Sequence, residues 1–281
     1  MGLFFREKVY LHFIWKRKGI ASLESLDGTP KGLYKTEYRK RIVMAKRKAK
    51  KGEKKMNSKY KSYIKDPYTK KLYTNVVEEY TGIARIYNDK WKNYLASTEQ
   101  ALLDQLKLKG KETILDAGCG TGSLLVAIRQ KFKHRGNILG FDITPAMLDL
   151  AEYHLSKDKF NKTLSLELAH CENFSAKNNS VDVVISSSVL HHLPHPDHAL
   201  AEFHRVLKKN GRLLILDICT DYPTTFIFDR FARLFHRAHH KAYSAAEVEE
   251  MLKKHKFTVT AFKTWKATPT LGVFLFEAKK K

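Results

Sequence analysis

A glycine-rich turn between an apolar strand and a helix is the feature that most constrains the fold. Residues 112–123 read ETILDAGCGTGS: an apolar run ends at Asp116, and three glycines follow at alternate positions. Glycine lets the backbone turn sharply and lets a ligand approach main-chain N–H groups closely. The helix predicted over 124–132 favours a negatively charged ligand group at its N-terminus. The segment therefore predicts a ligand-binding turn at the end of a strand.

Strand and helix signals alternate from about residue 76 to the end of the chain. This alternation is typical of a parallel sheet covered by helices on both faces. The chain has 281 residues, which is long enough for one such domain and an appendage. We therefore predict an α/β domain over 76–281, preceded by a basic N-terminal region, 1–75, that is partly disordered or binds a surface.

A second acidic residue follows the next predicted strand. The apolar run 138–141 ends at Asp142, about 20 residues past the glycine loop. A carboxylate at that place can accept hydrogen bonds from both hydroxyls of a ribose. Thr144 and Pro145 then mark the start of another helix. The alternative is an ordinary acid at a strand end.

The loop distinguishes two classes of cofactor. Dinucleotide sites use G-x-G-x-x-G, whereas this loop is G-x-G-x-G, with Gly118, Gly120 and Gly122, and Ser123 stands at the third dinucleotide position. Asp116, just ahead of the glycines, would repel a pyrophosphate and suits a ligand that carries an ammonium and a sulfonium. The loop therefore favours S-adenosylmethionine over NAD.

Four motifs in this order resemble the class I S-adenosylmethionine-dependent methyltransferases. The branch is the one that includes ubiquinone/menaquinone-biosynthesis and related small-molecule enzymes. The motifs lie at 115–122, 140–148, 180–193 and 205–217, and the resemblance runs from about Tyr80 to Ala278. It implies a doubly wound, Rossmann-like, seven-stranded sheet that is mostly parallel with an antiparallel edge. It also implies methyl transfer from S-adenosyl-L-methionine.

The resemblance implies that the cofactor is held by Tyr87, Asp116, Ala117, Gly118, Cys119, Gly120, Thr121, Gly122, Asp142, Ile143, Met147, His170, Cys171 and Ser187. In the family, 116–122 holds the methionine end, Asp142 takes the ribose, and Ile143 and Met147 flank the adenine. Ser187 would lie under the methionine moiety.

At two of these places the match to the family's pattern is weaker. The adenine edge falls on His170 and Cys171, where the family commonly has Asp or Asn followed by Ala, so His170 departs from the pattern. The family also often places a tyrosine from an N-terminal helix over the cofactor. Tyr87 is the candidate, with Tyr80 behind it, and helix packing is the alternative for Tyr87.

His191 and His192 follow the fourth predicted strand and are the candidate general bases. A base is needed only when the acceptor must lose a proton early, and neutral histidine suits that work near pH 7. The alternative is that both histidines shape the loop. With His195, Asp197 and His198 they form a histidine-rich stretch, but HExxH and paired cysteines are missing, so no metal is expected.

The charge is concentrated at the start of the chain. Lys and Arg number 52 against 29 acids, and residues 1–75 hold 22 of the basic and 6 of the acidic residues, a net +16 of the total +23. Such a region attracts an anionic membrane surface or RNA, unless it is simply a solvated tail. Three dispersed cysteines and the lack of a long apolar run predict a cytoplasmic protein. The basic N-terminal region adds peripheral attachment at a membrane surface as one alternative.

The acceptor class depends on the segment after the fifth strand. Phe228, Phe231 and Phe235 share one helical face flanked by arginines, which indicates either core packing or an aromatic lid over a small, apolar or lipid-like acceptor. The alternative is an RNA or protein substrate that docks through the basic arm. The [DN]-P-P-[YFW] signature of nucleic-acid amino methylation is missing at 186–189. A non-catalytic S-adenosylmethionine-binding module is the third alternative.

Overall fold

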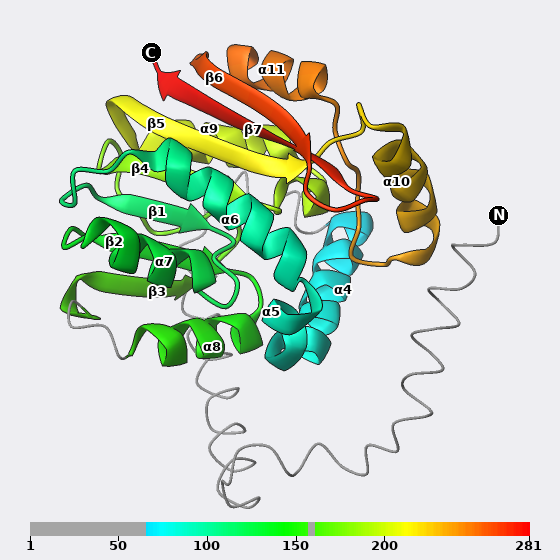
Figure 1. Ribbon diagram of the computed structural model, residues 1–281, viewed down its shortest axis with the longest axis horizontal. Helices are drawn as coiled ribbons and strands as arrows, with labels where there is room; N and C mark the ends of the chain where they lie inside the picture. The colour runs from blue at the N-terminus through cyan, green and yellow to red at the C-terminus, as the bar shows by residue number, and fades with distance from the viewer. Residues whose placement is uncertain (1–65, 157–160) are drawn as a thin grey trace, which may run out of the picture. The chain divides into compact units, whose positions relative to one another are not determined.

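The computed structural model of the chain describes residues 66–156 and 161–281. These residues build a seven-stranded sheet with helices on both faces (Figure 1). The strands are β1 (Ile114–Ala117), β2 (Ile138–Asp142), β3 (Leu164–Leu168), β4 (Val181–Ser187), β5 (Leu207–Ile218), β6 (Phe257–Lys266) and β7 (Gly272–Lys280). The α-helices are α4 (Pro67–Ile83), α5 (Tyr87–Lys90), α6 (Lys92–Leu106), α7 (Ser123–Phe132), α8 (Pro145–Leu155), α9 (Pro196–Val206), α10 (Pro223–Phe235) and α11 (Ala245–Lys254).

The strand order is β3-β2-β1-β4-β5-β7-β6. The first five strands of that order run parallel, whereas β7 is antiparallel to both β5 and β6. Strand β1 lies in the middle of the sheet, and the later strands extend the sheet outward, first to β3 and then to β6. This order confirms the predicted doubly wound fold with an antiparallel edge.

The strand register brings the predicted site residues to one edge of the sheet. Ala117 at the end of β1 pairs with Phe141 of β2 and with Ser186 of β4. Parallel strands that end level place the loops that follow them side by side. The glycine loop, Asp142 and Ser187 therefore lie at the same carboxyl edge.

Two buried apolar clusters hold helices on opposite faces of the sheet. On one face, Leu102 of α6, Leu125 of α7 and Leu155 of α8 are at most 1% exposed and pack against β1, β2 and β4. On the other face, Phe203 of α9 and Leu252 of α11 pack beneath β5 and β7. Both faces are covered, so the central strands consist almost entirely of buried apolar residues, as parallel sheets require.

Two helix starts differ in how they are capped. Ser244 and Glu247 form a capping box at the start of α11, in which each side chain accepts the other residue's backbone N–H. Thr144 is the N-cap residue of α8 and Pro145 its first residue, but the Thr144 side chain makes no capping bond. Instead, the Thr144 N–H donates to Asp142, which holds that carboxylate in place.

Helix α4 begins at Pro67 and continues to Ile83, so one helix runs through residue 75. The division of the chain at that residue, predicted from the charge of 1–75 and the alternation that begins at about 76, stays a prediction. The predictions of a surface-binding or RNA-binding arm concern residues that lie mostly outside the described part. Among residues 66–156 and 161–281, no helix is both long enough and apolar enough to cross a bilayer.

Candidate active site

A cavity opens at the carboxyl edge of β1, β2 and β4. Its walls come from α4, α5, the glycine loop and the loops after β2, β3 and β4. The lining residues are Tyr73, Val76, Tyr80, Tyr87, Gly118, Gly120, Phe141, Asp142, Ile143, Thr144, Met147, Ala169, His170, Cys171, Glu172, Ser187, Ser188, Val189, His192 and Leu193.

The glycine loop takes a conformation that side chains oppose. Gly118, Gly120 and Gly122 have φ values of +76°, +52° and +75°. A Cβ on Gly118 would lie 2.3 Å from Cγ2 of Val189, whereas a Cβ on Gly120 would meet no atom within 4 Å. Gly118 is therefore needed for close packing, and Gly120 leaves open space beside the backbone for a ligand.

Asp142 is fixed by backbone donors at the tip of β2. Its Oδ2 accepts from Gly120 N at 3.0 Å, and its Oδ1 accepts from Thr144 N at 2.7 Å. Burial raises the pKa of this carboxyl, and the two N–H donors oppose the rise. Each oxygen keeps a further lone pair, so a ligand with two neighbouring hydroxyls can still bind there.

Asp116 is a second buried carboxyl, with 2% of its surface exposed. Burial raises its pKa to about 7, and the nearby charges of Asp142 and Glu99 add to that rise. Among the described residues, no lysine or arginine lines the cavity, and no basic side chain forms an ion pair with Asp116. The carboxyls of Asp116 and Asp142 therefore favour a cationic ligand over an anionic one.

The part of the wall predicted to contact the adenine edge, at His170 and Cys171, also includes the carboxyl of Glu172. Burial lowers the pKa of His170 to about 4, so its imidazole is neutral near pH 7. Beside it, Glu172 is 5% exposed, and burial raises its pKa to about 7. The Tyr73 hydroxyl donates to Glu172 Oε1, while Glu172 Oε2 has no hydrogen-bond partner among the described residues. That oxygen is a buried acceptor in the wall of the cavity.

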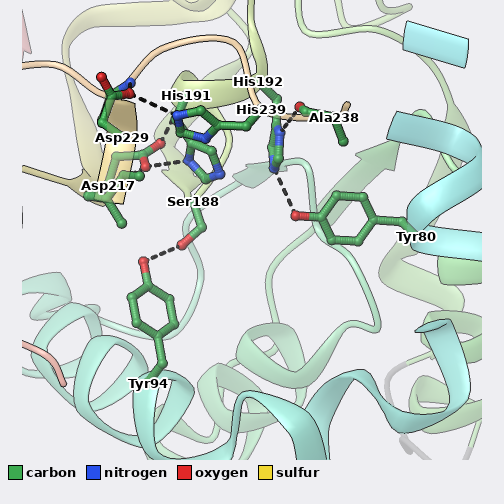
Figure 2. Close-up of polar contacts among 11 residues, drawn as sticks. Tyr80, Tyr94, Ser188, His191, His192, Asp217, Asp229, Ala238 and His239 are labelled. Carbon is green, nitrogen blue, oxygen red and sulfur yellow. Dashed lines mark hydrogen bonds and ion pairs between the residues drawn. The ribbon is translucent and has the colours of Figure 1, made fainter. Parts of the chain in front are cut away.

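A tyrosine and a histidine meet across the cavity from α4 and the loop after β4. His192 Nδ1 lies 2.6 Å from the Ala238 carbonyl oxygen, which can only accept, so Nδ1 carries the proton. His192 Nε2 is then the acceptor for the Tyr80 hydroxyl at 2.8 Å. Figure 2 shows the Tyr80 ring aimed at the His192 imidazole. Burial and the adjacent His191 lower the pKa of His192, which keeps it neutral.

His191 belongs to a separate pair. Its Nδ1 lies 2.6 Å from Oδ1 of Asp217, a carboxyl that is 1% exposed at the end of β5. Its ring centroid is 3.9 Å from that of His192. His191 does not line the cavity. The Asp217 carboxylate therefore fixes the tautomer and orientation of His191, and the His191 ring packs against His192.

A tyrosine from α6 supports the strand end below the cavity. The Tyr94 hydroxyl lies 2.8 Å from Oγ of Ser188 (Figure 2). Ser188 has a φ of +58°, an uncommon conformation for a residue with a side chain. Packing from α6 thus helps to hold the turn that carries Ser187 and Ser188 to the cavity.

The structure brings most of the predicted site residues together, but not all of them reach the cavity wall. Those that line it are Tyr87, Gly118, Gly120, Asp142, Ile143, Met147, His170, Cys171, Ser187 and His192. Those that do not are Asp116, Ala117, Cys119, Thr121, Gly122 and His191. Sequence reasoning did not single out Glu172, Ser188 or Tyr94. It named Tyr80 only as a neighbour of Tyr87.

The three phenylalanines of the predicted aromatic segment lie on α10, and none of them lines this cavity. Phe228 packs partly buried against a core cluster, as the core-packing alternative predicts. Phe231 and Phe235 are exposed by 54% and 64%, so core packing does not apply to them, and the lid stays a prediction. Among the described residues, no group of three or more His, Cys, Asp or Glu side chains is placed to hold a metal ion.

Comparison with known proteins decides the family. A family model described as a methyltransferase domain matches residues 108–269, more than half of the chain. The chain belongs to the class I S-adenosylmethionine-dependent methyltransferases. It is therefore an enzyme of that class, and the geometry of the cavity can be interpreted accordingly.

Among curated relatives of the methyltransferase, quinone-biosynthesis enzymes are prominent. The demethylmenaquinone methyltransferase of Lactobacillus johnsonii is 28% identical over 207 residues, which cover 66% of this chain and 83% of that protein. The ubiquinone/menaquinone biosynthesis C-methyltransferase UbiE of Citrifermentans bemidjiense is 30% identical over 124 residues. That match covers 44% of this chain and 52% of the relative, so the chain spans about half the length of UbiE.

Solved structures agree on the fold. The YcgJ protein of Bacillus subtilis superposes with a TM-score of 0.57 at 16% identity, over 65% of this chain and 97% of that one. The geranyl diphosphate C-methyltransferase of Streptomyces coelicolor, solved with S-adenosyl-L-homocysteine, gives a TM-score of 0.55 at 14% identity. That match covers 66% of this chain and 76% of the other. At these identities the likeness establishes the fold alone.

Proposed function

We propose that this methyltransferase transfers a methyl group from S-adenosyl-L-methionine to a small, apolar, lipid-like acceptor such as a quinone-type ring. The observation that carries the proposal is the character of the cavity wall. Its described residues include aromatic rings and the carboxyls of Asp142 and Glu172, but no lysine or arginine. A phosphate-bearing acceptor needs such cations, whereas a cationic cofactor and a neutral acceptor do not. The quinone-biosynthesis relatives support the same acceptor class.

The cavity fits the cofactor at its polar points. When bound, S-adenosyl-L-methionine supplies a methyl group on a sulfonium that is already a good leaving group. Asp142 would hold the ribose hydroxyls, Ile143 and Met147 would flank the adenine, and Gly120 leaves space along the loop. Asp116 supplies negative charge from beneath the loop. Holding the methyl group and the acceptor in line and excluding water then account for most of the acceleration of methyl transfer.

We assign to Glu172 a contact that sequence reasoning gave to His170. The exocyclic amine of an adenine is a donor, and the neutral imidazole of His170 carries only one acceptor nitrogen. The Glu172 carboxyl lines the same wall, and its Oε2 is buried without a partner among the described residues. A hydrogen bond from the adenine amine would give that oxygen a partner. Without one, burying the oxygen costs the free energy of removing it from water.

On the acceptor side, Tyr80 and His192 would move one proton. An acceptor hydroxyl gives its proton to the Tyr80 oxygen as the Tyr80 proton passes to Nε2 of His192 across the 2.8 Å bond. The Ala238 carbonyl, which accepts from Nδ1, stabilises the imidazolium that forms. His192 starts neutral because burial lowers its pKa. The same shift weakens it as a base, so the contact of its Nδ1 with the Ala238 carbonyl has to offset part of the cost of the imidazolium.

His191 supports this arrangement as a positioning residue. Its ring packs against that of His192, tilted by 45°, and Asp217 fixes its orientation. Backbone bonds from His240 and Lys241 to the His191 carbonyl hold the same loop in place. This differs from the sequence prediction, in which both histidines were candidate bases.

The test is a labelled-methyl assay on the full chain with a short-tailed demethylated quinol and, separately, with RNA. We expect transfer to the quinol, and a loss of about a hundredfold or more in Tyr80→Phe. Tyr68→Phe is the matched control, because Tyr68 lies on the same helix and also contacts a histidine, His240, outside the cavity. Transfer to RNA, or equal rates in both variants, would refute the proposal.

A further inference from the structure

The parallel strands begin at the edge of the sheet opposite the cavity. Ile114, where β1 begins, pairs with Ile138 of β2, and Ile138 pairs with Leu164 of β3, so these strands start level. Strand β7 runs the other way, and its last residue, Lys280, pairs with Phe257 at the start of β6. The loops that precede the parallel strands and the C-terminus therefore lie at one edge, away from α4 and α5 (Figure 1).

Ten exposed lysines gather at this edge. Among the described residues, none of the ten side chains has an ion pair or a hydrogen bond. We name this set the basic edge, and its members are Lys107, Lys109, Lys111, Lys133, Lys162, Lys177, Lys209, Lys256, Lys279 and Lys281.

The acids in the described parts of these loops are already engaged. The Glu112 carboxylate accepts from three backbone N–H groups of its own loop. The Asp182 carboxylate pairs with Lys208 at 2.7 Å. The positive charge is felt inside the domain, because the pKa of His204 is lowered by burial and then further by nearby lysines, Lys256 among them. The basic edge thus keeps a positive charge that its own loops do not neutralise.

Helix dipoles account for only part of this charge. Lys107 and Lys133 are the C-cap residues of α6 and α7, with φ values of +42° and +48°, and Lys256 follows α11 with a φ of +61°. Glycine is the usual residue in that conformation, although the negative end of a helix favours a cation there. The other seven lysines lie outside the α-helices, so the dipoles explain at most three of the ten.

The two edges of the sheet carry opposite charges. The buried carboxyls of Asp116, Asp142 and Asp217 lie at the ends of β1, β2 and β5, on the side of the cavity. A polyanion is therefore repelled at the cavity side and attracted at the basic edge. Seven strands about 4.8 Å apart make this edge about 29 Å wide, close to one turn of a nucleic-acid duplex.

We propose that the basic edge binds a nucleic-acid duplex through its phosphates. Lysines act there as point charges, which contact phosphates and do not read the base sequence. In the described parts of these loops, no large apolar side chain is exposed. The edge thus has no ring on which the bases of a single strand could stack, and no apolar anchor for a bilayer.

A duplex bound at the basic edge lies on the far side of the sheet from the cavity. It is therefore a docking partner and not the methyl acceptor. The proposal does not depend on the identity of that acceptor.

Fluorescence anisotropy of the full chain with labelled 12-base-pair duplexes, one of RNA and one of DNA, gives the first test. The edge variant combines Lys107→Gln, Lys109→Gln, Lys111→Gln and Lys133→Gln. The control variant combines Lys70→Gln, Lys71→Gln, Lys90→Gln and Lys92→Gln. It loses the same charge from exposed lysines of α4, α5 and α6 that do not line the cavity. Residues 1–65 are the same in both variants, so their charge contributes equally.

We expect the edge variant to bind at least about tenfold more weakly near 0.1 M salt, and the control to change by less than about threefold. The salt dependence, as the slope of log K against log salt concentration, should fall by about 3 in the edge variant, because each lost phosphate contact removes about 0.9. Binding of either duplex in this pattern supports the proposal, and the tighter one identifies the source. Equal losses in the two variants, or no loss in the edge variant, would overturn it.

Two controls accompany this comparison. Unchanged binding of S-adenosyl-L-methionine shows that each variant is folded, since the cavity is at the other edge. Partition onto phosphatidylcholine vesicles that contain phosphatidylglycerol tests a bilayer as the partner. If the edge variant loses vesicle binding but keeps its affinity for the duplexes, the basic edge binds a bilayer and the proposal is wrong.

Lysine acetylation of the wild-type full chain gives the second test and needs no variant. With saturating duplex, we expect Lys109, Lys111 and Lys133 to be acetylated at least about threefold more slowly, as measured by mass spectrometry of peptides. Lys90 and Lys92 should react at an unchanged rate. Protection of the second group, or equal protection of both groups, would contradict binding at the basic edge.

Discussion

Replacing Asp116 by Asn should stabilise the free enzyme while it weakens cofactor binding. Asp116 is buried, and burial together with the charges of Asp142 and Glu99 raises its pKa from 3.8 to about 7. A carboxyl with a raised pKa in the folded state costs stability when it is ionised. That cost is absent below about pH 4, grows as the pH rises, and is complete above about pH 7.

The pKa shift sets the size of the effect. A rise of about three pKa units at 1.36 kcal/mol each corresponds to at most about 4 kcal/mol at pH 8. Asn has the same shape and carries no charge, so Asp116→Asn should recover a part of this amount. For a domain of this size, each kcal/mol raises the melting temperature by about 2–4 °C. Thermal melts should therefore show a stabilised variant at pH 8 and little difference at pH 4.

Cofactor binding should change in the opposite sense. If the ionised Asp116 binds the cation, the affinity of the wild type for S-adenosyl-L-methionine should increase by about tenfold between pH 6 and pH 8, because about a tenth of the carboxyl is ionised at pH 6. Calorimetric titration of Asp116→Asn should show weaker binding with no such rise. A variant that is no more stable at pH 8, or a wild type whose affinity does not change with pH, would refute this reasoning.

Three further changes test individual contacts. Asp142→Ala should cost about 1.5–3 kcal/mol of cofactor binding, measured by calorimetry, and unchanged affinity would remove Asp142 from the site. Tyr80→Phe should leave the affinity for the cofactor within about twofold while kcat falls about a hundredfold or more, because only the bond to His192 is lost; a change in affinity alone would contradict the proton-transfer role. Gly118→Ala should lose about 1–3 kcal/mol of stability in denaturant unfolding, from its positive φ and its contact with Val189, and adding Val189→Ala should relieve only the contact. Full stability of the single variant would show that the loop relaxes freely.

Local sequence signals were sufficient to predict where individual strands and helices begin and end. The apolar runs that end in Asp116 and Asp142 are short, and each is followed by a glycine or a helix start, so their ends could be located from the sequence. The parallel pairing of β1 with β2 then brings both acids to one edge of the sheet. Strand β3, Leu164–Leu168, was not located, because its residues are mostly only half-buried and its apolar pattern is weak.

Contacts between distant segments could not be predicted in the same way. Tyr80 and His192 are 112 residues apart, and only the packing of α4 over the loop after β4 brings them together. Glu172 gives no sign in the sequence that one of its oxygens is buried without a partner among the described residues.

Helix α10 shows a different limit of sequence reasoning. The spacing of Phe228, Phe231 and Phe235 correctly indicates a helix. Periodicity defines a face of a helix but not the direction in which that face points. The structure turns Thr225 and Asp229 inward beside Phe228, and Asp229 accepts from the Ala242 N–H and pairs with His239 inside the domain.

The central claim is that the acidic cavity at the carboxyl edge of the sheet binds a cationic sulfur nucleoside. Titration of the purified full chain with S-adenosyl-L-methionine, with its demethylated product and with NAD measures this directly. We predict one bound nucleoside per chain for the first two compounds and no binding of NAD. Failure to bind either nucleoside, or binding of NAD with equal affinity, would contradict the account.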